Sequence, residues 1–161
     1  MAEGQVYFAK SDGVLVLQFE GEIRYTLAPP LDRFLDIQFA DGTLQSVCVD
    51  LNRVTAIDST GIGLLAKTAK LLKHNSEEKP VLFSSNDEIN ELLGAVCLDS
   101  YCIIVQGIAE PVSLESLPEY VADESEMADT ILEAHRILCE LSEDNRAQFQ
   151  NVVDALERER H

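Results

Sequence analysis

The sequence predicts an α/β domain with a mixed, mostly parallel sheet, followed by an acidic helical extension. Over residues 1–106, short apolar runs rich in β-branched residues alternate with segments of helical periodicity. Strand–helix–strand crossovers of this length favour parallel pairing, with helices packed on the sheet. After a proline-containing stretch, apolar residues recur only at helical spacing. We therefore expect a domain at 1–106, a linker at 107–119 and a helical extension at 120–161.

The domain is predicted to begin with a β-hairpin. Residues 5–9 and 14–20 have the composition of strands and flank the turn signal Ser11-Asp12-Gly13. Residues 21–25 are expected to leave the sheet as a loop. Pro29-Pro30 can open the first helix, because proline is tolerated in a first helical turn.

Three further strands are predicted from continuous apolar runs. They lie at 47–51, 81–84 and 101–105. One helix should connect the first two of them and end near Asn75, and another should span about 87–94 before the last strand. The order β-β-α-β-α-β-α-β follows from these assignments.

The strongest local signal lies between the strand at 47–51 and the helix after it. Asp58, Ser59 and Thr60 are three good helix-capping residues in a row, so Ser59 is expected at a helix N-terminus with its hydroxyl near solvent. Free backbone N–H groups and the helix dipole favour negative charge there. Gly61 and Gly63 would let another backbone come close. A plain, well-capped helix start is the simpler interpretation of the same residues.

The charge balance limits the classes of partner. The 161 residues include 12 basic and 29 acidic side chains, a formal net charge of −17. Nucleic acid and anionic membrane surfaces would be repelled, so neither is expected as a partner. A protein with a basic face would be attracted, although the acidity can also serve solubility alone.

No cofactor or metal site is expected. The four cysteines are scattered without C-x-x-C spacing, and the three histidines lie far from them in sequence. Buried free thiols in a reducing cytoplasm are the expected state. The first residues lack the features of a signal peptide, and no apolar run approaches the roughly 20 residues of a membrane span.

The C-terminal extension carries an apolar stripe and much of the charge. Its apolar residues recur at four-three spacing in a first helix and lie on one face of a second: Met127, Ile131, Ala134, Leu138 and Leu141, then Phe149, Val152, Val153 and Leu156. Residues 113–161 hold thirteen acidic residues against four arginines. The stripe is explained by packing on the domain, by a helical hairpin, or by pairing with a second copy as a homodimer.

The motif resembles the STAS domain of bacterial anti-sigma-factor antagonists. The segment Ile57–Leu65, with Gly21-Glu22-Ile23 and the order of elements, carries the resemblance over about two thirds of the chain. It implies a partner-switching protein that is not an enzyme. Such a protein, when unphosphorylated, binds an anti-sigma factor that is also a serine kinase, and a PP2C-type phosphatase reverses the phosphorylation. By motif position Ser59 is the phosphoacceptor, and the surrounding residues that would contact the partner are Arg24, Asp50, Asp58, Thr60, Gly61, Ile62 and Gly63.

One departure concerns Arg24, because the family usually has an aspartate at this position. An arginine there can pair with a phosphoserine, so we expect it near Ser59. Two other functions stay open: a STAS-like binding subunit of a transport or lipid-trafficking complex without phosphorylation, and an enzyme with Ser59 as nucleophile. The second lacks a base or orienting partner that the sequence could name.

Overall fold

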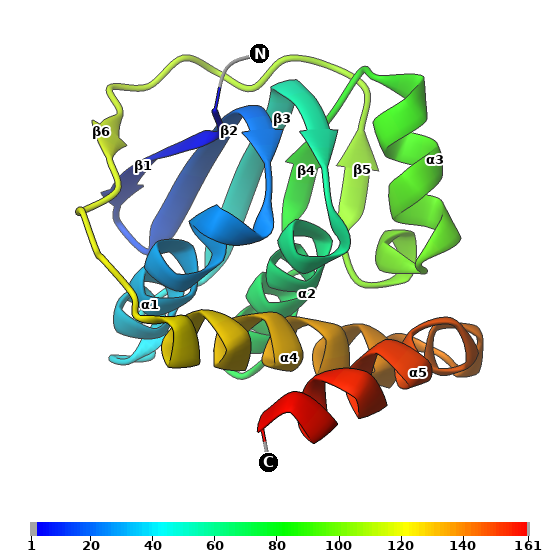
Figure 1. Ribbon diagram of the computed structural model, residues 1–161. Helices are drawn as coiled ribbons and strands as arrows, with labels where there is room; N and C mark the ends of the chain where they lie inside the picture. The colour runs from blue at the N-terminus through cyan, green and yellow to red at the C-terminus, as the bar shows by residue number, and fades with distance from the viewer. Residues whose placement is uncertain (1–2, 161) are drawn as a thin grey trace.

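The computed structural model describes residues 3–160, which form one six-stranded sheet with helices packed against it (Figure 1). The strand order is β5-β4-β3-β2-β1-β6. The strands are β1 (Gln5–Ser11), β2 (Val14–Ile23), β3 (Ser46–Ile57), β4 (Val81–Phe83), β5 (Ile103–Val105) and β6 (Glu115–Ser116). Pairing is parallel from β2 to β5 and antiparallel for β1 with β2 and with β6. The predicted mixed, mostly parallel sheet is confirmed.

The helices follow the predicted order. The α-helices are α1 (Ala28–Phe39), α2 (Ser59–Lys73), α3 (Asp87–Ala95), α4 (Glu124–Leu141) and α5 (Glu143–Arg160). Two short 3₁₀ helices, η1 (Tyr25–Leu27) and η2 (Leu98–Ser100), were not predicted. In Figure 1, α1 and α2 lie against the sheet, α3 stands beside β5, and α4 crosses over α1 and α2.

The sheet has a buried and an open face. Along β2 the side chains alternate, with Leu15, Leu17 and Phe19 at most 1% exposed and their neighbours half-buried or exposed. This period of two is what a strand with one covered face requires. The buried side of β2 contributes to the core that α1 and α2 share, and α4 packs on these two helices.

The hairpin's second strand and β3 run longer than predicted. We expected residues 21–25 to leave the sheet, but β2 continues to Ile23 and β3 to Ile57. Two irregularities in the β2–β3 register allow this, and Gly21 takes φ 77°, a value that suits glycine. The extended strands bring Ile23 and Ile57 together at the start of α2.

The expected linker adds an edge strand. Within residues 106–123 the only regular element is β6, which pairs with the outer edge of β1. Figure 1 shows this segment passing from β5 over the end of the sheet to β1 and then down to α4. The start of the helical extension is thereby fixed beside the hairpin.

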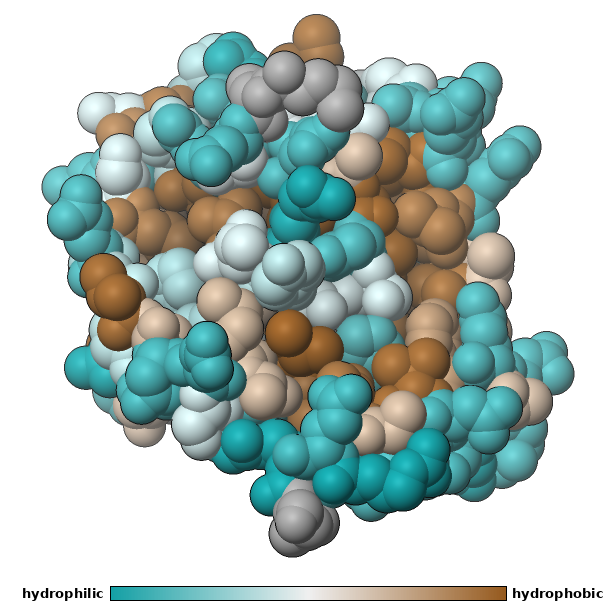
Figure 2. All heavy atoms as spheres, in the orientation of Figure 1, coloured by the Kyte–Doolittle hydropathy of each residue, from teal (hydrophilic) through white to brown (hydrophobic). Residues whose placement is uncertain are grey.

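The extension packs within the chain. Leu138 of α4 is fully buried, and Phe149 and Val153 of α5 are 8% and 3% exposed. Asn145, at the start of α5, is also buried and donates from Nδ2 to the carbonyls of Val96 and Leu138 at 2.7 and 2.9 Å. The outer surface of α5 is mostly hydrophilic (Figure 2). Of the three explanations for the apolar stripe, the helices show packing on the domain and on each other.

Replacing Leu138 by alanine should lower the free energy of unfolding by about 2–5 kcal/mol, because the side chain is fully buried. Val152→Ala is the control, since Val152 is 40% exposed and should cost less than about 1 kcal/mol. Urea denaturation of the full-length protein measures both. Equal, small losses would show that α4 does not contribute to the folded core.

Candidate functional site

Asp58 organises the start of α2. As the N-cap residue, it accepts the backbone N–H of Gly61 at 2.8 Å through Oδ1. Its second oxygen accepts the N–H of Tyr25 at 2.8 Å, and its own N–H donates to the Ile23 carbonyl at 3.0 Å. One carboxylate therefore caps the helix and holds the loop between β2 and α1 against it.

The next residues turn inward. Thr60 and Ile62 are 3% and 2% exposed, so the capping triplet does not present three side chains to solvent. A Cβ at Gly61 would lie 2.9 Å from a side-chain carbon of Ile57 and 3.1 Å from one of Ile23. The glycine thus allows the first turn of α2 to sit directly on the ends of β2 and β3. Thr60 is excluded as an exposed phosphoacceptor by its burial.

Helix α4 covers the same turn. A Cβ at Gly63 would lie 2.6 Å from the carbonyl oxygen of Ala134 and 2.8 Å from its Cβ. No real Cβ is tolerated at such distances from backbone, so the two helices approach through a glycine on one side and an alanine on the other. The close backbone approach predicted for Gly63 is made, and its occupant is this chain's own extension.

Ser59 is half-buried under α4 and bonded to it. Its Oγ lies 2.8 Å from Nε2 of His135, which is 5% exposed. Nδ1 of that ring lies 2.8 Å from the Ile131 carbonyl, an oxygen that can only accept. Nδ1 therefore carries the proton, and in the neutral ring Nε2 accepts the hydrogen bond that Ser59 donates. The hydroxyl that was predicted to lie near solvent is half-buried and hydrogen-bonded to α4.

The Ser59–His135 pair has the distances of a nucleophile and a base. The Ile131 carbonyl orients the ring, so the partners that the sequence could not name are present. A substrate, however, would need room beside the hydroxyl. Four cavities found among residues 3–160 are lined by other residues, and the His135 side chain that contacts Ser59 is buried.

Arg24 lies in the loop that Asp58 holds. Its side chain is 67% exposed, and its Nη1 lies 3.9 Å from a carboxylate oxygen of Glu22. Within the described part of the chain no hydrogen bond or ion pair connects Arg24 with Ser59. The structure brings its backbone to the site through its neighbour Tyr25 and leaves the side chain in solvent.

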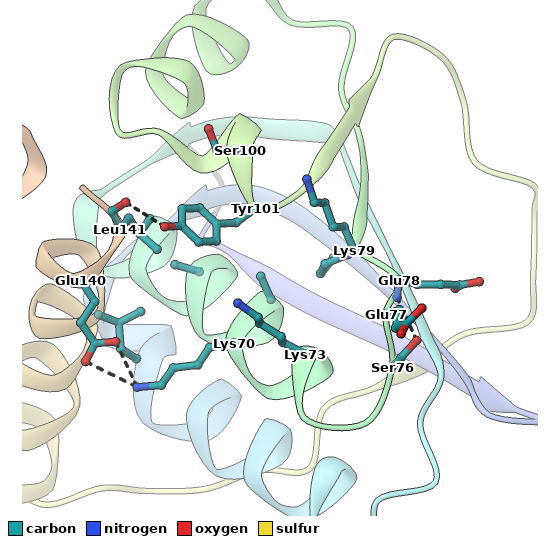
Figure 3. Close-up of a pocket in the computed structure, with 14 residues that line it drawn as sticks. Lys70, Lys73, Ser76, Glu77, Glu78, Lys79, Ser100, Tyr101, Glu140 and Leu141 are labelled. Carbon is teal, nitrogen blue, oxygen red and sulfur yellow. Dashed lines mark hydrogen bonds and ion pairs between the residues drawn. The ribbon is translucent and has the colours of Figure 1, made fainter.

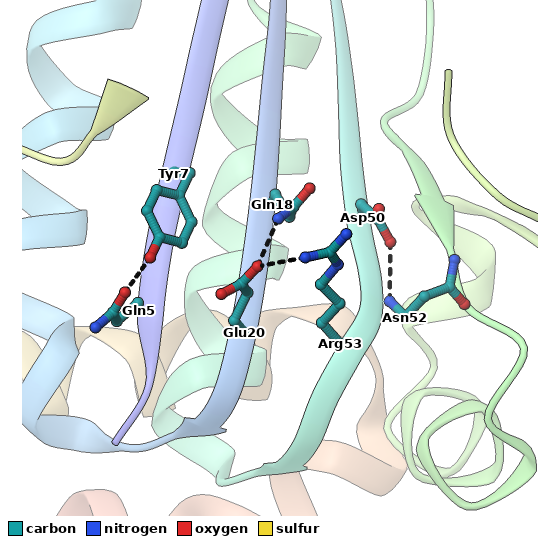
Figure 4. Close-up of polar contacts among 7 residues, drawn as sticks. All are labelled: Gln5, Tyr7, Gln18, Glu20, Asp50, Asn52 and Arg53. Carbon is teal, nitrogen blue, oxygen red and sulfur yellow. Dashed lines mark hydrogen bonds and ion pairs between the residues drawn. The ribbon is translucent and has the colours of Figure 1, made fainter. Parts of the chain in front are cut away.

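Asp50 lies away from Ser59. It stands in the middle of β3, and its Oδ1 accepts the Asn52 N–H at 2.9 Å. The seven intervening residues 51–57 are all in the strand, so Asp50 and Asp58 are separated by roughly 25 Å. Figure 4 shows Asp50 on the open face with the Glu20–Arg53 pair at 3.1 Å. A direct part in the Ser59 site does not follow from this position.

His135 is the site residue that the sequence did not identify. Its position on the apolar stripe, between Ile131 and Leu138, is the signal that could have found it. A polar side chain on a buried helix face needs a hydrogen-bonding partner. Which partner it would find depended on where α4 docks, and the sequence left that open.

Other chemistry is sparse. No group of three or more potential metal ligands occurs among residues 3–160. All four cysteines are free, and burial raises the pKa of the Cys102 thiol to about 12. Over the same residues, no helix combines the length and hydropathy needed to span a bilayer.

Curated relatives share part of this chain. Anti-sigma-B factor antagonists from several strains of Staphylococcus aureus, including NCTC 8325 and COL, are 38% identical over 72 residues. The match covers 45% of this chain and 65% of the relatives, so the chain spans about two thirds of their length.

Solved structures support the fold. An anti-sigma factor antagonist from Mycobacterium paratuberculosis superposes with a TM-score of 0.56 at 22% identity, covering 66% of this chain and 88% of that one. The unphosphorylated anti-sigma factor antagonist SpoIIAA gives 0.53 at 12% identity, covering 63% and 89%.

The family model described as the STAS domain matches residues 5–104, which include every strand from β1 to β4, most of β5, and helices α1 to α3. The matched region ends before β6 and the two C-terminal helices, so these lie outside the family core. Over most of its length, the chain belongs to the STAS domain family.

Proposed function

We propose that this protein is an anti-sigma factor antagonist of a bacterial partner-switching system. Unphosphorylated, it binds a kinase-type anti-sigma factor; phosphorylation of Ser59 releases it, and a PP2C-type phosphatase restores it. The observation that carries the proposal is the position of Ser59, first residue of α2, beside the capping Asp58 in a STAS domain. The names of the curated relatives support the same class of function. The chain then acts by binding, without catalysis of its own, in the cytoplasm where free thiols persist.

The physical switch is the added charge. A phosphate on Ser59 Oγ adds about −1.5 to −2 charges next to the Asp58 carboxylate. It also needs space that His135 now occupies at 2.8 Å from the oxygen. We infer that phosphorylation is incompatible with the present contact between Ser59 and α4. A kinase or an anti-sigma factor that reaches Ser59 must likewise find α4 displaced.

A static binding module is the second candidate. The Ser59–His135 hydrogen bond favours it, because a serine used only to hold α4 would make this same contact. Intact-mass spectrometry of the protein from its native host separates the two functions. A species heavier by one phosphate supports the switch, and its absence under all growth conditions supports the static module.

A homodimer through the C-terminal helices would have to form over faces that already pack within the chain. Of the nine stripe residues, four are buried within the chain (Ala134, Leu138, Phe149 and Val153), four are half-buried, and Val152 is 40% exposed. A second copy would have to displace these contacts or bind elsewhere.

Ser59→Ala should bind the anti-sigma factor without regulation, and Ser59→Glu should bind roughly 100-fold more weakly, because a charge is placed in the contact. Thr60→Val is the matched control: it removes the neighbouring, buried hydroxyl and should leave phosphorylation at Ser59 intact. Radiolabelling with the isolated kinase and titration calorimetry measure these effects. Labelling of Ser59→Ala at the wild-type level would refute the assignment.

Ala134→Leu should accelerate phosphorylation of Ser59 by about tenfold or more, because the larger side chain cannot fit against Gly63 and weakens the docking of α4. The substitution leaves every residue of the STAS domain unchanged. Ala147→Leu, on the exposed face of α5, is the control, and its Ser59 should be phosphorylated at the wild-type rate. Equal initial rates for all three proteins would show that α4 does not limit access.

Arg24→Asp should deepen the loss of partner affinity that Ser59→Glu produces. The loop that carries Arg24 is bonded to Asp58, and we expect its exposed side chain to turn from Glu22 toward a charge placed on Ser59. A double-mutant cycle on partner affinity gives the coupling between the two positions. Strictly additive effects would show that Arg24 does not moderate the added charge.

A further inference from the structure

A cavity of about 570 Å³ opens between the C-terminal half of α2 and the last turns of α4 (Figure 3). Its volume is in the range of small-molecule sites. The walls come from three parts of the chain: the C-terminal half of α2 with the segment after it, η2, and the last turns of α4. Neither the family motif nor the Ser59 site uses this space.

The inner surface is apolar. Several of the side chains that line it are buried: Ala66, Ala69, Pro80 and Ile137. The Tyr101 ring completes the wall, and its hydroxyl donates to the Leu141 carbonyl at 2.8 Å, which ties η2 to the end of α4. The rigid apolar wall suits the hydrocarbon or aryl part of a ligand.

The rim carries three lysines and three glutamates, so its formal charge is balanced in an otherwise acidic protein. Three of the five lysines in the sequence line the cavity: Lys70, Lys73 and Lys79. Lys70 is paired with Glu140 at 3.1 Å. Among the residues described, Lys73 and Lys79 have no carboxylate within ion-pair distance, although the net charge is −17.

The acidic residues of the rim do not occupy this position. Glu140 is used by Lys70, and Figure 3 shows Glu77 and Glu78 on the opposite side of the cavity, with their carboxylates away from the Lys73 ammonium. Two unpaired ammonium groups thus stand beside an apolar wall. An anionic head with an apolar body satisfies both features at once.

We propose that this cavity binds a small amphipathic organic anion, of the type of a medium-chain fatty carboxylate, with its head at Lys73 and Lys79. The residues that line this cavity do not include Ser59, Asp58 or His135, so the assignment of the site does not rest on phosphorylation. Because its walls belong to α2 and α4, a bound anion bridges the two helices and stabilises α4 over Ser59 by linkage. A bound ligand would therefore disfavour the undocked position of α4 that phosphorylation of Ser59 requires.

Titration calorimetry of the full-length protein with decanoate tests the site. Decanoate should bind, whereas acetate, inorganic phosphate and decanol, which lack either the body or the head, should not. Lys73→Gln/Lys79→Gln should weaken decanoate binding by at least about tenfold, because two charged contacts are removed. Lys10→Gln, an exposed lysine on β1, is the control and should bind like the wild type.

A second variant tests the apolar part. Ala69→Leu narrows the cavity from its α2 wall and should also weaken decanoate binding, while circular dichroism confirms that the variant is folded. Decanol binding as tightly as decanoate, or decanoate binding unaffected by the double lysine variant, would overturn the proposal. So would the absence of decanoate binding to the wild type. None of these outcomes depends on an anti-sigma factor, so they leave the proposed function standing.

Discussion

The arrangement of the site depends on one close approach, between the backbone of α4 at Ala134 and the side-chain-free position Gly63. A Cβ at position 63 would lie 2.6 Å from the Ala134 carbonyl oxygen, so a glycine is needed for α4 to lie as near to α2 as it does. That contact explains why His135 is buried and why it can bond to Ser59. The cavity lies farther along the interface between α2 and α4. The glycine-containing first turn of α2 is thus already covered by α4 of the same chain. An external partner then meets only the fraction of molecules in which α4 is undocked, and its apparent affinity is reduced by that fraction.

Asp58 stabilises the start of α2 and, in the proposed switch, also lies next to the phosphoacceptor. Its two oxygens satisfy an orphan N–H of the helix and one of the preceding loop, both at 2.8 Å. The carboxylate is thereby held next to Ser59, so it cannot rotate away from a negative charge added to the Ser59 hydroxyl. Fixed charge of this kind makes the response to modification larger than a mobile surface carboxylate would.

Local patterns were sufficient for most of the fold. The alternation along β2 and the four-three stripe of α4 reflect contacts with a period of two or about 3.6 residues, which the sequence displays directly. The capping run Asp58-Ser59-Thr60 reflects a local hydrogen bond, from the Gly61 N–H to the Asp58 carboxylate. Positions that depend on distant segments were not predictable in this way. The two-residue strand β6 has no periodicity of its own and exists because β1 offers a free edge. His135 meets Ser59 across 76 residues of sequence, and only the docking of α4 decides that.

The edge strand β6 has a further effect on the covering helix. Because β6 is anchored to β1, only the seven residues 117–123 separate a fixed point on the sheet from the first turn of α4. A helix on so short a tether stays at millimolar effective concentration near its binding surface even when it is released. Docking of α4 is therefore independent of the amount of protein in the cell, reverses rapidly, and sets a constant threshold that any partner in solution has to exceed.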